Sequence, residues 1–298
     1  SVRQMSETTR PRRSVLYMPG SKERALEKAR TLAADALILD LEDAVAPSAK
    51  DEARDKVCAA VGQGGYGQRE MVIRVNGLDT PWGKDDMAAA FKAKPHAILV
   101  PKVSTLEDMA EIRAAFAGAG VGGAIALWIM METPLAMLNA RDIAAVARDD
   151  HAPLSCMVMG TNDLAKETGA SLGENRFSMI PWLATCVAAA KANGLSIIDG
   201  VYNDFRNIEG LEAECRQGRS LGMDGKTLIH PGQLDAANAV FAPSDEEVER
   251  ARAVIAAFEL PENAGKGAIE IDGRMVELLH REIASRTVAM ADAIAAMN

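Results

Sequence analysis

The sequence predicts a closed (β/α)8 barrel (a TIM barrel, in the α/β class) followed by a C-terminal helical lid or arm. Three observations support this fold. Eight short apolar runs alternate with eight segments of helical pattern over residues 13–242. The runs are continuous in hydrophobicity, as expected of parallel strands that are buried on both faces. No GxGxxG motif follows the first run, which disfavours the alternative of a doubly wound open sheet.

The predicted strands and helices alternate regularly along the chain. The apolar runs cover residues 15–18, 36–41, 71–75, 97–100, 124–131, 156–159, 195–198 and 226–229. The helical patterns cover residues 21–33, 48–60, 82–92, 105–116, 134–147, 179–192, 207–220 and 233–240. Ser21 resembles an N-cap of the first helix, which has Glu23 early and Lys28 late, as the helix dipole favours. Eight such units are the number that a (β/α)8 barrel requires.

The pattern changes after Pro243. Ser244 is predicted to cap a helix that ends near residue 258. A short apolar run at 268–271, a turn at Asp272-Gly273 and a helix over 275–297 follow. We therefore expect residues 243–298 to form a lid or an oligomerisation segment outside the barrel. Residues 1–12 are expected to be a disordered or added N-terminus.

Composition excludes several classes of function. The 298 residues include 33 Lys and Arg against 42 Asp and Glu, a formal charge of −9, which gives no general attraction to nucleic acid or to an anionic membrane. No apolar stretch reaches 18 residues and the N-terminus lacks an apolar signal core, so we expect no membrane span. The four cysteines show no CxxC spacing, which predicts neither a zinc site nor a disulfide framework and favours the cytoplasm.

Polar residues follow most of the predicted strands. In a barrel of this kind the C-terminal strand ends carry the chemistry. The residues at these ends are Asp40, Glu42, Asp43, Arg74, Asn76, Lys102, Glu132, Asp163, Asp199 and His230. For any single residue, the simpler explanation is that strands end at the surface. That explanation is weaker for Asp40, Arg74 and Glu132, which are embedded in apolar sequence, because a buried charge needs a partner, a metal or a ligand.

The acidic strand ends favour a hard cation. No Cys or His lies beside them in sequence, and oxygen-only ligands suit Mg²⁺ better than Zn²⁺. Arg24 and Lys28 are four residues apart on one predicted helix face and could meet phosphates, although a solvated face explains them as well. His230 is either a ligand contact or an ordinary histidine at the barrel rim.

Eight motifs then carry a family resemblance. They are Arg13-Ser-Val-Leu-Tyr-Met-Pro-Gly20, Leu39-Asp-Leu-Glu-Asp-Ala-Val45, Ile73-Arg-Val-Asn76, Val100-Pro-Lys102, Glu132-Thr-Pro134, Gly160-Thr-Asn-Asp-Leu164, Ile198-Asp-Gly-Val-Tyr202 and Gly225-Lys-Thr-Leu-Ile-His-Pro231. In this order they resemble the citrate lyase β-subunit (CitE-like) family of the HpcH/HpaI aldolase superfamily. That family includes malyl-CoA, citramalyl-CoA and β-methylmalyl-CoA lyases.

The resemblance implies a Mg²⁺-bearing barrel whose C-terminal segment caps a neighbouring subunit in a homotrimer or a dimer of trimers. It implies that Glu132 and Asp163 bind the metal and that Arg74 and Glu132 bind substrate. It also implies that a set of residues at the first and last strands holds the coenzyme A arm: Tyr17, Arg24, Lys28, Ile229 and His230.

One motif departs from the family pattern. The family's CoA lyases carry Asp-Gly-x-Met-x-Asp in the tail, and the last Asp is the catalytic acid or base offered to the adjacent subunit. Here the segment reads Asp272-Gly-Arg-Met-Val-Glu277, so the matching carboxylate is Glu277. It is one methylene longer than the family's Asp.

The resemblance implies a Mg²⁺-dependent carbon–carbon lyase. We expect reversible Claisen-type cleavage of a 3-hydroxyacyl-CoA with a terminal carboxylate into an acyl-CoA and a 2-oxo acid. Glu277, Arg74 and Asp40 are the expected catalytic residues. Two alternatives stay open: a malyl-CoA-type thioesterase on the same scaffold, and a citrate lyase β subunit that works within a complex on an acyl-carrier protein.

Overall fold

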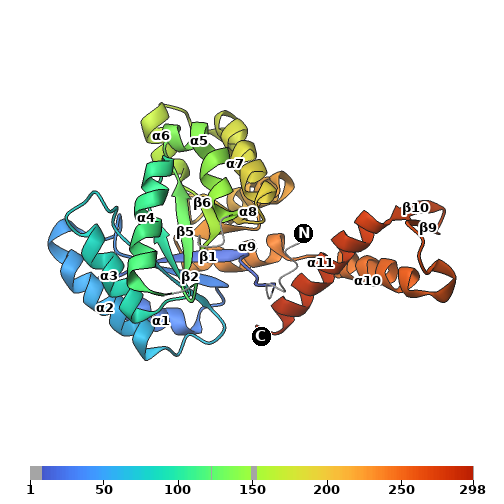
Figure 1. The fold of residues 1–298 in the computed structure, drawn as a ribbon, viewed down its shortest axis with the longest axis horizontal. Helices are drawn as coiled ribbons and strands as arrows, with labels where there is room; N and C mark the ends of the chain where they lie inside the picture. Colours follow the sequence, from blue (N-terminus) through green and yellow to red (C-terminus); the bar gives the residue numbers. More distant parts are fainter. Residues whose placement is uncertain (1–8, 122, 149–152, 298) are drawn as a thin grey trace. The chain divides into compact units, whose positions relative to one another are not determined.

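The computed structural model describes residues 9–121, 123–148 and 153–297, which divide into two compact units. The first unit covers residues 12–239, and the second comprises residues 9–11 and 240–297. In the first unit eight parallel strands pair in sequence order (Figure 1). The first strand, β1 (Ser14–Pro19), pairs with both β2 (Ala36–Asp40) and β8 (Gly225–Leu228), so the sheet closes on itself. The predicted (β/α)8 barrel is confirmed.

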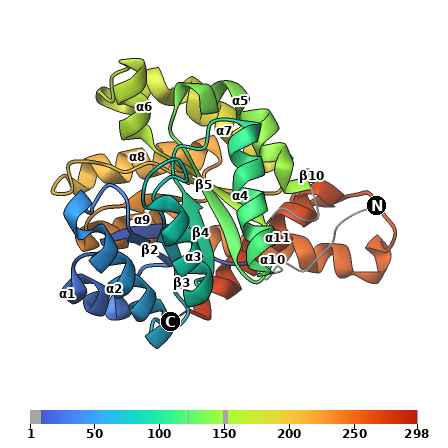
Figure 2. The same cartoon turned by 60° about the vertical axis from the view of Figure 1, so that its left-hand side comes forward.

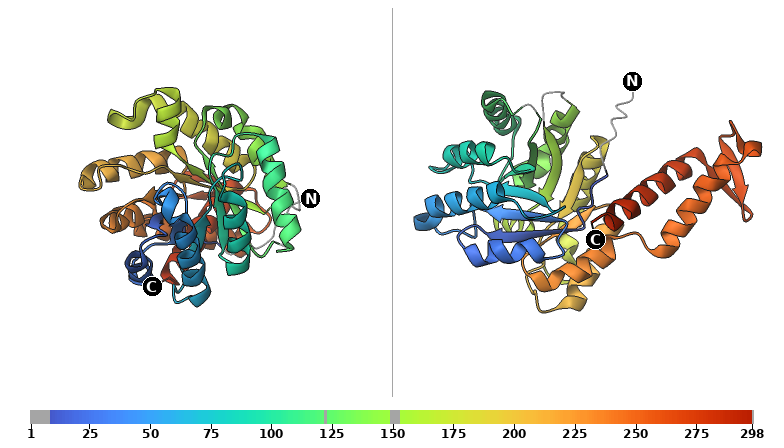
Figure 3. Two further views of the ribbon diagram at one scale, coloured as in Figure 1. Left: turned by 90° about the vertical axis from the view of Figure 1, so that its left-hand side faces the viewer. Right: turned by 90° about the horizontal axis from the view of Figure 1, so that it is seen from below.

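Helices surround the strands on the outside of the barrel, as the left view of Figure 3 shows. The other strands are β3 (Glu70–Arg74), β4 (Ala97–Val100), β5 (Ala126–Met131), β6 (Leu154–Met159) and β7 (Ser196–Asp199). The helices are α1 (Glu23–Lys28), α2 (Lys50–Gln63), α3 (Gly83–Ala93), α4 (Leu106–Ala119), α5 (Pro134–Ala145), α6 (Thr161–Thr168), α7 (Ile180–Ala192), α8 (Ile208–Leu221) and α9 (Leu234–Phe241). Figure 2 shows α1 to α4 along one flank of the barrel.

Alternate residues of each strand face the barrel interior, where they form one apolar core. Its members are Val15, Ala36, Ile38, Val72, Ala97, Leu99, Trp128, Met130, Cys156, Val158 and Ile198. Because strand side chains alternate with a period of two, the next inward-facing positions lie at the C-terminal mouth. Asp40, Arg74 and Glu132 each stand two residues beyond a core residue, so they continue the inward-facing rows into the mouth.

Two predicted elements of the barrel need correction. The first helix is much shorter than residues 21–33 and its N-cap is Lys22, not Ser21. Ser21 instead belongs to the turn after β1, in which Lys22 N–H donates to the Pro19 carbonyl at 3.1 Å. Residues 161–168, which lie outside the eight predicted helical patterns, form α6, a helix of only eight residues.

The second unit is a helical hairpin. The helix α10 (Asp245–Glu259) begins at the predicted cap Ser244, whose side chain accepts from Glu247 N–H at 3.1 Å in a capping box. It lies beside α11 (Leu278–Ala295), and β9 (Ala268–Ile271) and β10 (Arg274–Glu277) pair antiparallel between them (Figures 1 and 3). The predicted helix over 275–297 therefore starts at residue 278, because the preceding residues belong to β10.

Residues 1–8 of the predicted N-terminal segment lie outside the described residues. All four cysteines are free, consistent with the absence of a disulfide framework. Among the described residues, no helix has both the length and the apolar character needed to cross a membrane.

Candidate active site

Arg74 and Asp40 form a buried pair at the barrel mouth. They are register partners at the C-terminal ends of β3 and β2. Arg74 Nε and Nη2 donate to the two Asp40 oxygens at 2.7 and 2.8 Å, and both side chains are almost fully buried. The guanidinium carbon lies 4.8 Å from the centre of the Tyr17 ring. This bidentate geometry satisfies two charges that would be costly to bury singly.

Asp40 is held ionised. Burial alone would raise the pKa of Asp40, but the charge of Arg74 and hydrogen bonds from three donors bring it below its usual range. Besides Arg74, the donors are the backbone N–H groups of Glu42 and Ala44, at 2.9 and 3.0 Å. Burial would likewise lower the pKa of Arg74, yet Asp40 holds it well above its usual value. With both oxygens engaged, Asp40 positions the guanidinium.

The third Arg74 nitrogen, Nη1, is turned toward the open part of the mouth. It lies 3.1 Å from Glu42 Oε2 and 3.9 Å from Asp43 Oδ2. Glu42 Oε2 is buried and makes this ion-pair contact without a well-aligned hydrogen bond. Burial raises the pKa of Glu42, and the charge of Arg74 opposes that effect. Nη1 and Glu42 Oε2 are therefore atoms that a ligand could engage.

Glu132 directly follows β5 inside the mouth and is 1% exposed. Its Oε1 accepts from the Lys102 backbone N–H at 2.8 Å. Its Oε2 approaches Gly160 so closely that a side chain at that position would collide with it, which is why the residue after β6 must be glycine. Burial raises the pKa of Glu132 to about 8; Arg74 opposes the rise, whereas Glu42 and Asp163 add to it.

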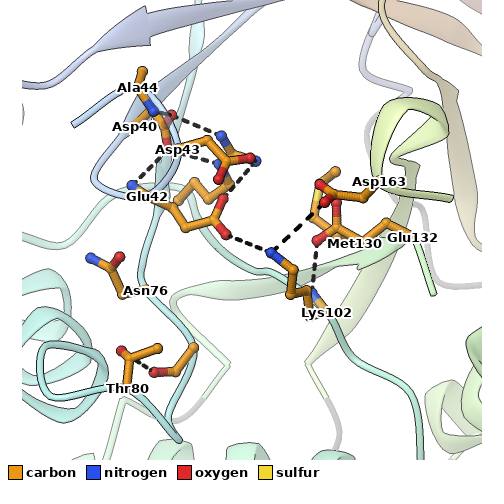
Figure 4. Close-up of polar contacts among 12 residues, drawn as sticks. Asp40, Glu42, Asp43, Ala44, Asn76, Thr80, Lys102, Met130, Glu132 and Asp163 are labelled. Carbon is orange, nitrogen blue, oxygen red and sulfur yellow. Dashed lines mark hydrogen bonds and ion pairs between the residues drawn. The ribbon is translucent and has the colours of Figure 1, made fainter. Parts of the chain in front are cut away.

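Asp163 lies in the first turn of α6, and Figure 4 shows it on the same side of the Lys102 ammonium as Glu132. The Lys102 ammonium stands between the carboxylates, as Figure 4 shows: Nζ is 3.3 Å from Glu42 Oε1 and 4.0 Å from Asp163 Oδ1. Burial would lower the pKa of Lys102, but Glu42, Asp163 and Glu132 raise it overall. The described residues thus place five carboxylates around two cations. They are Asp40, Glu42, Asp43, Glu132 and Asp163, around Arg74 and Lys102.

This donor set fits a divalent cation. Within the described residues no three Asp, Glu, His or Cys side chains form a ready-made metal cluster, so the protein would supply at most a pair of carboxylates. Glu132 and Asp163 are the predicted pair, and the surplus of negative charge around them would favour a doubly charged ion. Mg²⁺ commonly takes one or two protein carboxylates and leaves its remaining positions to water and substrate oxygens. The predicted Mg²⁺ site is therefore compatible with the geometry.

A pocket of about 290 Å³ adjoins this cluster. Glu42 and Lys102 line it together with Asn76, Asp79 and Thr80 from the segment after β3. Val45, Pro47 and Pro101 add apolar surface, and its volume is adequate for a small dicarboxylate group.

The residues predicted to hold the CoA arm fall into different surroundings. Tyr17 lies inside the mouth beneath Arg74, and its hydroxyl is 3.5 Å from Met130 Sδ. Burial raises the pKa of Tyr17 well above its usual value, so it stays neutral. Arg24 and Lys28 are exposed on α1. Tyr17 therefore lies against Arg74 inside the mouth, whereas Arg24 and Lys28 lie on the solvent-exposed face of α1.

His230 and Ile229 stand on the rim after β8. His230 Nδ1 accepts from Gly232 N–H at 3.0 Å, and its ring stacks on Phe205 with centroids 4.7 Å apart and planes 13° apart. Ile229 is 41% exposed and Phe205 39%. The sequence analysis did not single out Phe205. The feature that could have indicated it is its aromatic character in the otherwise polar loop after β7.

Asp199 does not belong to the mouth, although it is the last residue of β7. It is one residue past the inward-facing Ile198, so it points outward and approaches α8 at Gly218. Arg176 donates to both Asp199 oxygens at 2.8 and 3.0 Å, and Lys226 Nζ donates at 3.2 Å. Asp199 is one of the polar strand ends at which we expected the chemistry, but its side chain forms a buried ion-pair cluster with Arg176 and Lys226 instead.

Glu277 ends β10 in the second unit. It is exposed, and its backbone N–H donates to His280 Nδ1 at 2.9 Å. Its predicted catalytic role stays a prediction.

The barrel and its mouth define a class of protein: a TIM-barrel enzyme with a buried arginine–aspartate pair and a carboxylate site suited to Mg²⁺. The chain belongs to the HpcH/HpaI aldolase/citrate lyase family, whose model matches residues 13–231. The resemblance read from the eight motifs is confirmed.

Comparisons with individual proteins refine this placement. The chain is 53% identical to a (3S)-malyl-CoA thioesterase of Cereibacter sphaeroides, over 98% of this chain and 99% of that protein. It is 33% identical to an L-malyl-CoA/β-methylmalyl-CoA lyase of the same species, over 96% of each chain. The CitE protein of Mycobacterium tuberculosis, solved with magnesium, acetoacetate and coenzyme A, is 26% identical with a TM-score of 0.71, over 94% of this chain and 97% of that one.

A citrate lyase from Burkholderia xenovorans LB400, 19% identical with a TM-score of 0.80 over 95% of this chain and 92% of that one, supports the fold alone. The relatives named thioesterases are much more similar to this chain than those named lyases. Hydrolysis, which the sequence analysis kept as an alternative, is therefore better supported than carbon–carbon cleavage.

Proposed function

We propose that this protein is a Mg²⁺-dependent thioesterase that hydrolyses a malyl-CoA-type thioester, a CoA ester of a hydroxy diacid. The observation that carries the proposal is the 53% identity with (3S)-malyl-CoA thioesterase along nearly the whole of both chains. The charge arrangement at the mouth suits this substrate. The substrate's free carboxylate and hydroxyl oxygens can bind a metal ion, and its thioester oxygen can accept hydrogen bonds.

Arg74 binds an anionic oxygen of the acyl group in this proposal. Its Nε and Nη2 stay with Asp40, which fixes the plane of the guanidinium, and Nη1 is offered to the substrate. A guanidinium held in this way presents its charge without having to reorganise during the reaction. The adjoining pocket beside Glu42 would accommodate the rest of the acyl group.

Glu132 and Asp163 would hold Mg²⁺, which when bound supplies a Lewis acid and a template for substrate oxygens. The chain fixes one of these ligands firmly: the Lys102 N–H holds one Glu132 oxygen, and Gly160 leaves space for the other.

Hydrolysis adds the oxygen of water to the thioester carbonyl carbon and breaks the carbon–sulfur bond. One proton of the water goes to the departing sulfur, which gives the CoA thiol, and the other is released from the new carboxylic acid. Glu277 of a neighbouring subunit would accept the proton from the attacking water and deliver it to the departing sulfur. Glu is one methylene longer than the family's Asp, so it would serve a water molecule rather than a substrate carbon.

The CoA arm would lie over the rim formed by the ends of β1 and β8. Arg24 and Lys28 would meet its phosphates, and Ile229 and the His230–Phe205 stack would offer apolar and aromatic contact. We further propose a homotrimer or dimer of trimers, because Glu277 would then complete the site of an adjacent chain.

The second candidate function is reversible cleavage of malyl-CoA to acetyl-CoA and glyoxylate. The 33% identity with malyl-CoA/β-methylmalyl-CoA lyase favours it. A role as a citrate lyase β subunit on an acyl-carrier protein is the third.

Product analysis decides between these functions. Purified protein is incubated with (3S)-malyl-CoA and Mg²⁺ in water enriched in ¹⁸O, and the free thiol, glyoxylate and malate are measured separately. Hydrolysis gives equal amounts of thiol and malate, with one ¹⁸O in the malate carboxyl group and no glyoxylate. Glyoxylate and acetyl-CoA in equal amounts without free thiol would mean that the lyase assignment is correct. Turnover only of the acyl-carrier-protein thioester would favour the third function.

A further inference from the structure

Lys102 adopts a backbone conformation that is unusual for its residue type. It follows β4 with a φ of 53°, in the left-handed region that disfavours residues with a Cβ. Such a conformation persists where several contacts with the surrounding structure hold it in place, and it is often found at functional sites. The contacts of Lys102 show what holds it in this conformation.

Hydrogen bonds on both sides hold the Lys102 peptide groups. Its N–H donates to Glu132 Oε1 at 2.8 Å, and its carbonyl accepts from Ser104 Oγ at 3.0 Å. Ser104 Oγ in turn lies 2.6 Å from Thr133 Oγ1, and Thr133 caps α5 directly after Glu132. Hydrogen bonds thus join the turn after β4 to the end of β5 at two places. The positive φ directs the Lys102 N–H toward the Glu132 carboxylate.

The side chain of Lys102 serves a different set of groups. Its ammonium contacts Glu42 at 3.3 Å and Asp163 at 4.0 Å, from the ends of β2 and β6, and remains 46% exposed. The only other cation contacting these site carboxylates among the described residues is Arg74, which is committed to Asp40. The Lys102 ammonium therefore lies among the same carboxylates that would surround a divalent ion bound by Glu132 and Asp163 (Figure 4).

We propose that Lys102 is a positioning residue with two separable actions on the carboxylate site. Its backbone N–H orients Glu132, and its ammonium is the resident counter-ion of Glu42 and Asp163, which a divalent cation must displace from Asp163. This inference rests on the proposed Mg²⁺ site. The side chain keeps the metal-free site stable and weakens Mg²⁺ binding, whereas the backbone strengthens Mg²⁺ binding.

The side-chain action is tested by Lys102→Met, which removes the charge and keeps the length, and by Lys102→Arg, which keeps the charge. Lys94→Met is the matched control, because Lys94 is also left-handed (φ 56°) but is exposed at the C-cap of α3. The measurement is calorimetric titration of metal-stripped protein with MgCl2. Removing a competing charge at this distance should lower the Mg²⁺ dissociation constant about 3- to 30-fold in Lys102→Met and leave the Lys102→Arg and Lys94→Met values near wild type.

A second readout is thermal unfolding. Lys102→Met should unfold at a lower temperature than wild type without metal, and Mg²⁺ should close that gap. Mg²⁺ binding to Lys102→Met that is equal to or weaker than wild type overturns the counter-ion role. Absence of Mg²⁺ binding to wild type is a different outcome, because it removes the proposed metal site and this inference with it.

The backbone action is tested by Lys102→Val beside Lys102→Met. Both remove the charge, but a β-branched residue disfavours the left-handed region and should turn the N–H away from Glu132. Losing this support of a ligand should weaken Mg²⁺ binding about 10- to 100-fold relative to Lys102→Met. Lys102→Gly, which accepts the conformation freely, should match Lys102→Met. Lys94→Val controls for strain alone. Equal Mg²⁺ affinity in the Val and Met variants overturns the backbone role.

Discussion

Arg74 and Asp40 face each other across the β2–β3 ladder, joined by two hydrogen bonds of 2.7 and 2.8 Å. Their separation is set by the backbone register of adjacent strands, so the guanidinium is aligned before any ligand arrives. The third nitrogen of Arg74 lies 3.1 Å from Glu42 Oε2, and Glu42 lines the adjoining pocket.

Arg74→Lys tests the importance of this alignment. Lysine keeps the charge but loses the fork that binds Asp40 and the substrate together, so we expect kcat/KM to fall about 10- to 1000-fold. Steady-state kinetics with (3S)-malyl-CoA measure the loss, and Arg141→Lys on the exposed surface of α5 serves as the control. A near-normal kcat/KM in Arg74→Lys would make the arginine purely structural.

Removal of the metal should abolish turnover. Activity should disappear with EDTA and return with Mg²⁺ or Mn²⁺, and Glu132→Gln or Asp163→Asn should eliminate both activity and calorimetric Mg²⁺ binding. Circular dichroism verifies that the variants are folded. Full activity in either variant contradicts the assignment of these ligands.

Gly160→Ala probes the space beside Glu132. The added Cβ would collide with Oε2 and press on Met130 Cε at 3.1 Å, so the carboxylate must move. We expect the Mg²⁺ dissociation constant to rise about 10- to 100-fold, as for other disturbed ligand supports. Gly62→Ala in α2, where a Cβ meets nothing within 4 Å, is the control and should bind Mg²⁺ as wild type. Unchanged affinity in the Gly160 variant would show that Glu132 Oε2 does not face the metal.

Glu277 links the tail to the chemistry. If a neighbouring subunit supplies it, the inactive variants Glu277→Ala and Asp163→Asn should partly restore activity when their subunits are mixed after dissociation. Glu277→Asp should lower the rate of hydrolysis while changing any glyoxylate formation little. Full activity of Glu277→Ala, with no effect of mixing, would identify Glu277 as an ordinary surface carboxylate.

Asp199 allows a prediction about stability. Its burial raises its pKa, but Lys226 and Arg176 reverse that effect and place the pKa below its usual value. Asp199→Asn removes the fully buried one of the two carboxylates that these cations contact, the other being Glu214. We expect a loss of about 3–5 kcal/mol in the free energy of unfolding. Urea denaturation at pH 7 measures it, with Asp142→Asn in an exposed ion pair as the control, expected to cost at most about 1 kcal/mol.

The contribution of Asp199 to the free energy of unfolding depends on pH with a defined sign. A carboxylate whose pKa is lower in the folded protein stabilises it above the unfolded pKa, about 3.9 for Asp, and loses that effect as pH falls toward the folded pKa. The difference between wild type and Asp199→Asn should therefore be equal at pH 7 and pH 5 and shrink below about pH 4. A difference that grows on acidification would mean that Asp199 is protonated in the folded state.

The strand order and the barrel could be predicted from sequence because eight continuous apolar runs leave few other folds. The same continuity hid which strand residues face inward. Ile197 and Ile198, directly before Asp199, are both apolar although their side chains point to opposite faces of the strand. The sequence therefore shows no alternation from which Ile198 could be predicted to point in and Asp199 to point out. Arg74 and Glu132 were correctly singled out because a charge within an apolar run needs compensation, whichever way it faces.

Tyr17 shows another limit of sequence reasoning. The resemblance places it with Arg24 and Lys28 in the set expected to hold the CoA arm, and nothing in the local sequence shows that its ring packs against the Arg74 guanidinium. The contacts of Lys102 were equally hidden, because a positive φ at a lysine leaves no mark in the local sequence. Both depend on tertiary neighbours that lie 57 and 30 residues away along the chain.

The division of the mouth between the two halves of the barrel has a consequence for assembly. Strands β1 to β4 bring both cations and three carboxylates, and β5 and β6 lead to the two carboxylates proposed for the metal. The Lys102 N–H reaches Glu132 only when β4 pairs with β5. Pairing of the two halves of the barrel and assembly of the carboxylate cluster at the mouth are thus one event, so a half-barrel fragment would lack this cluster.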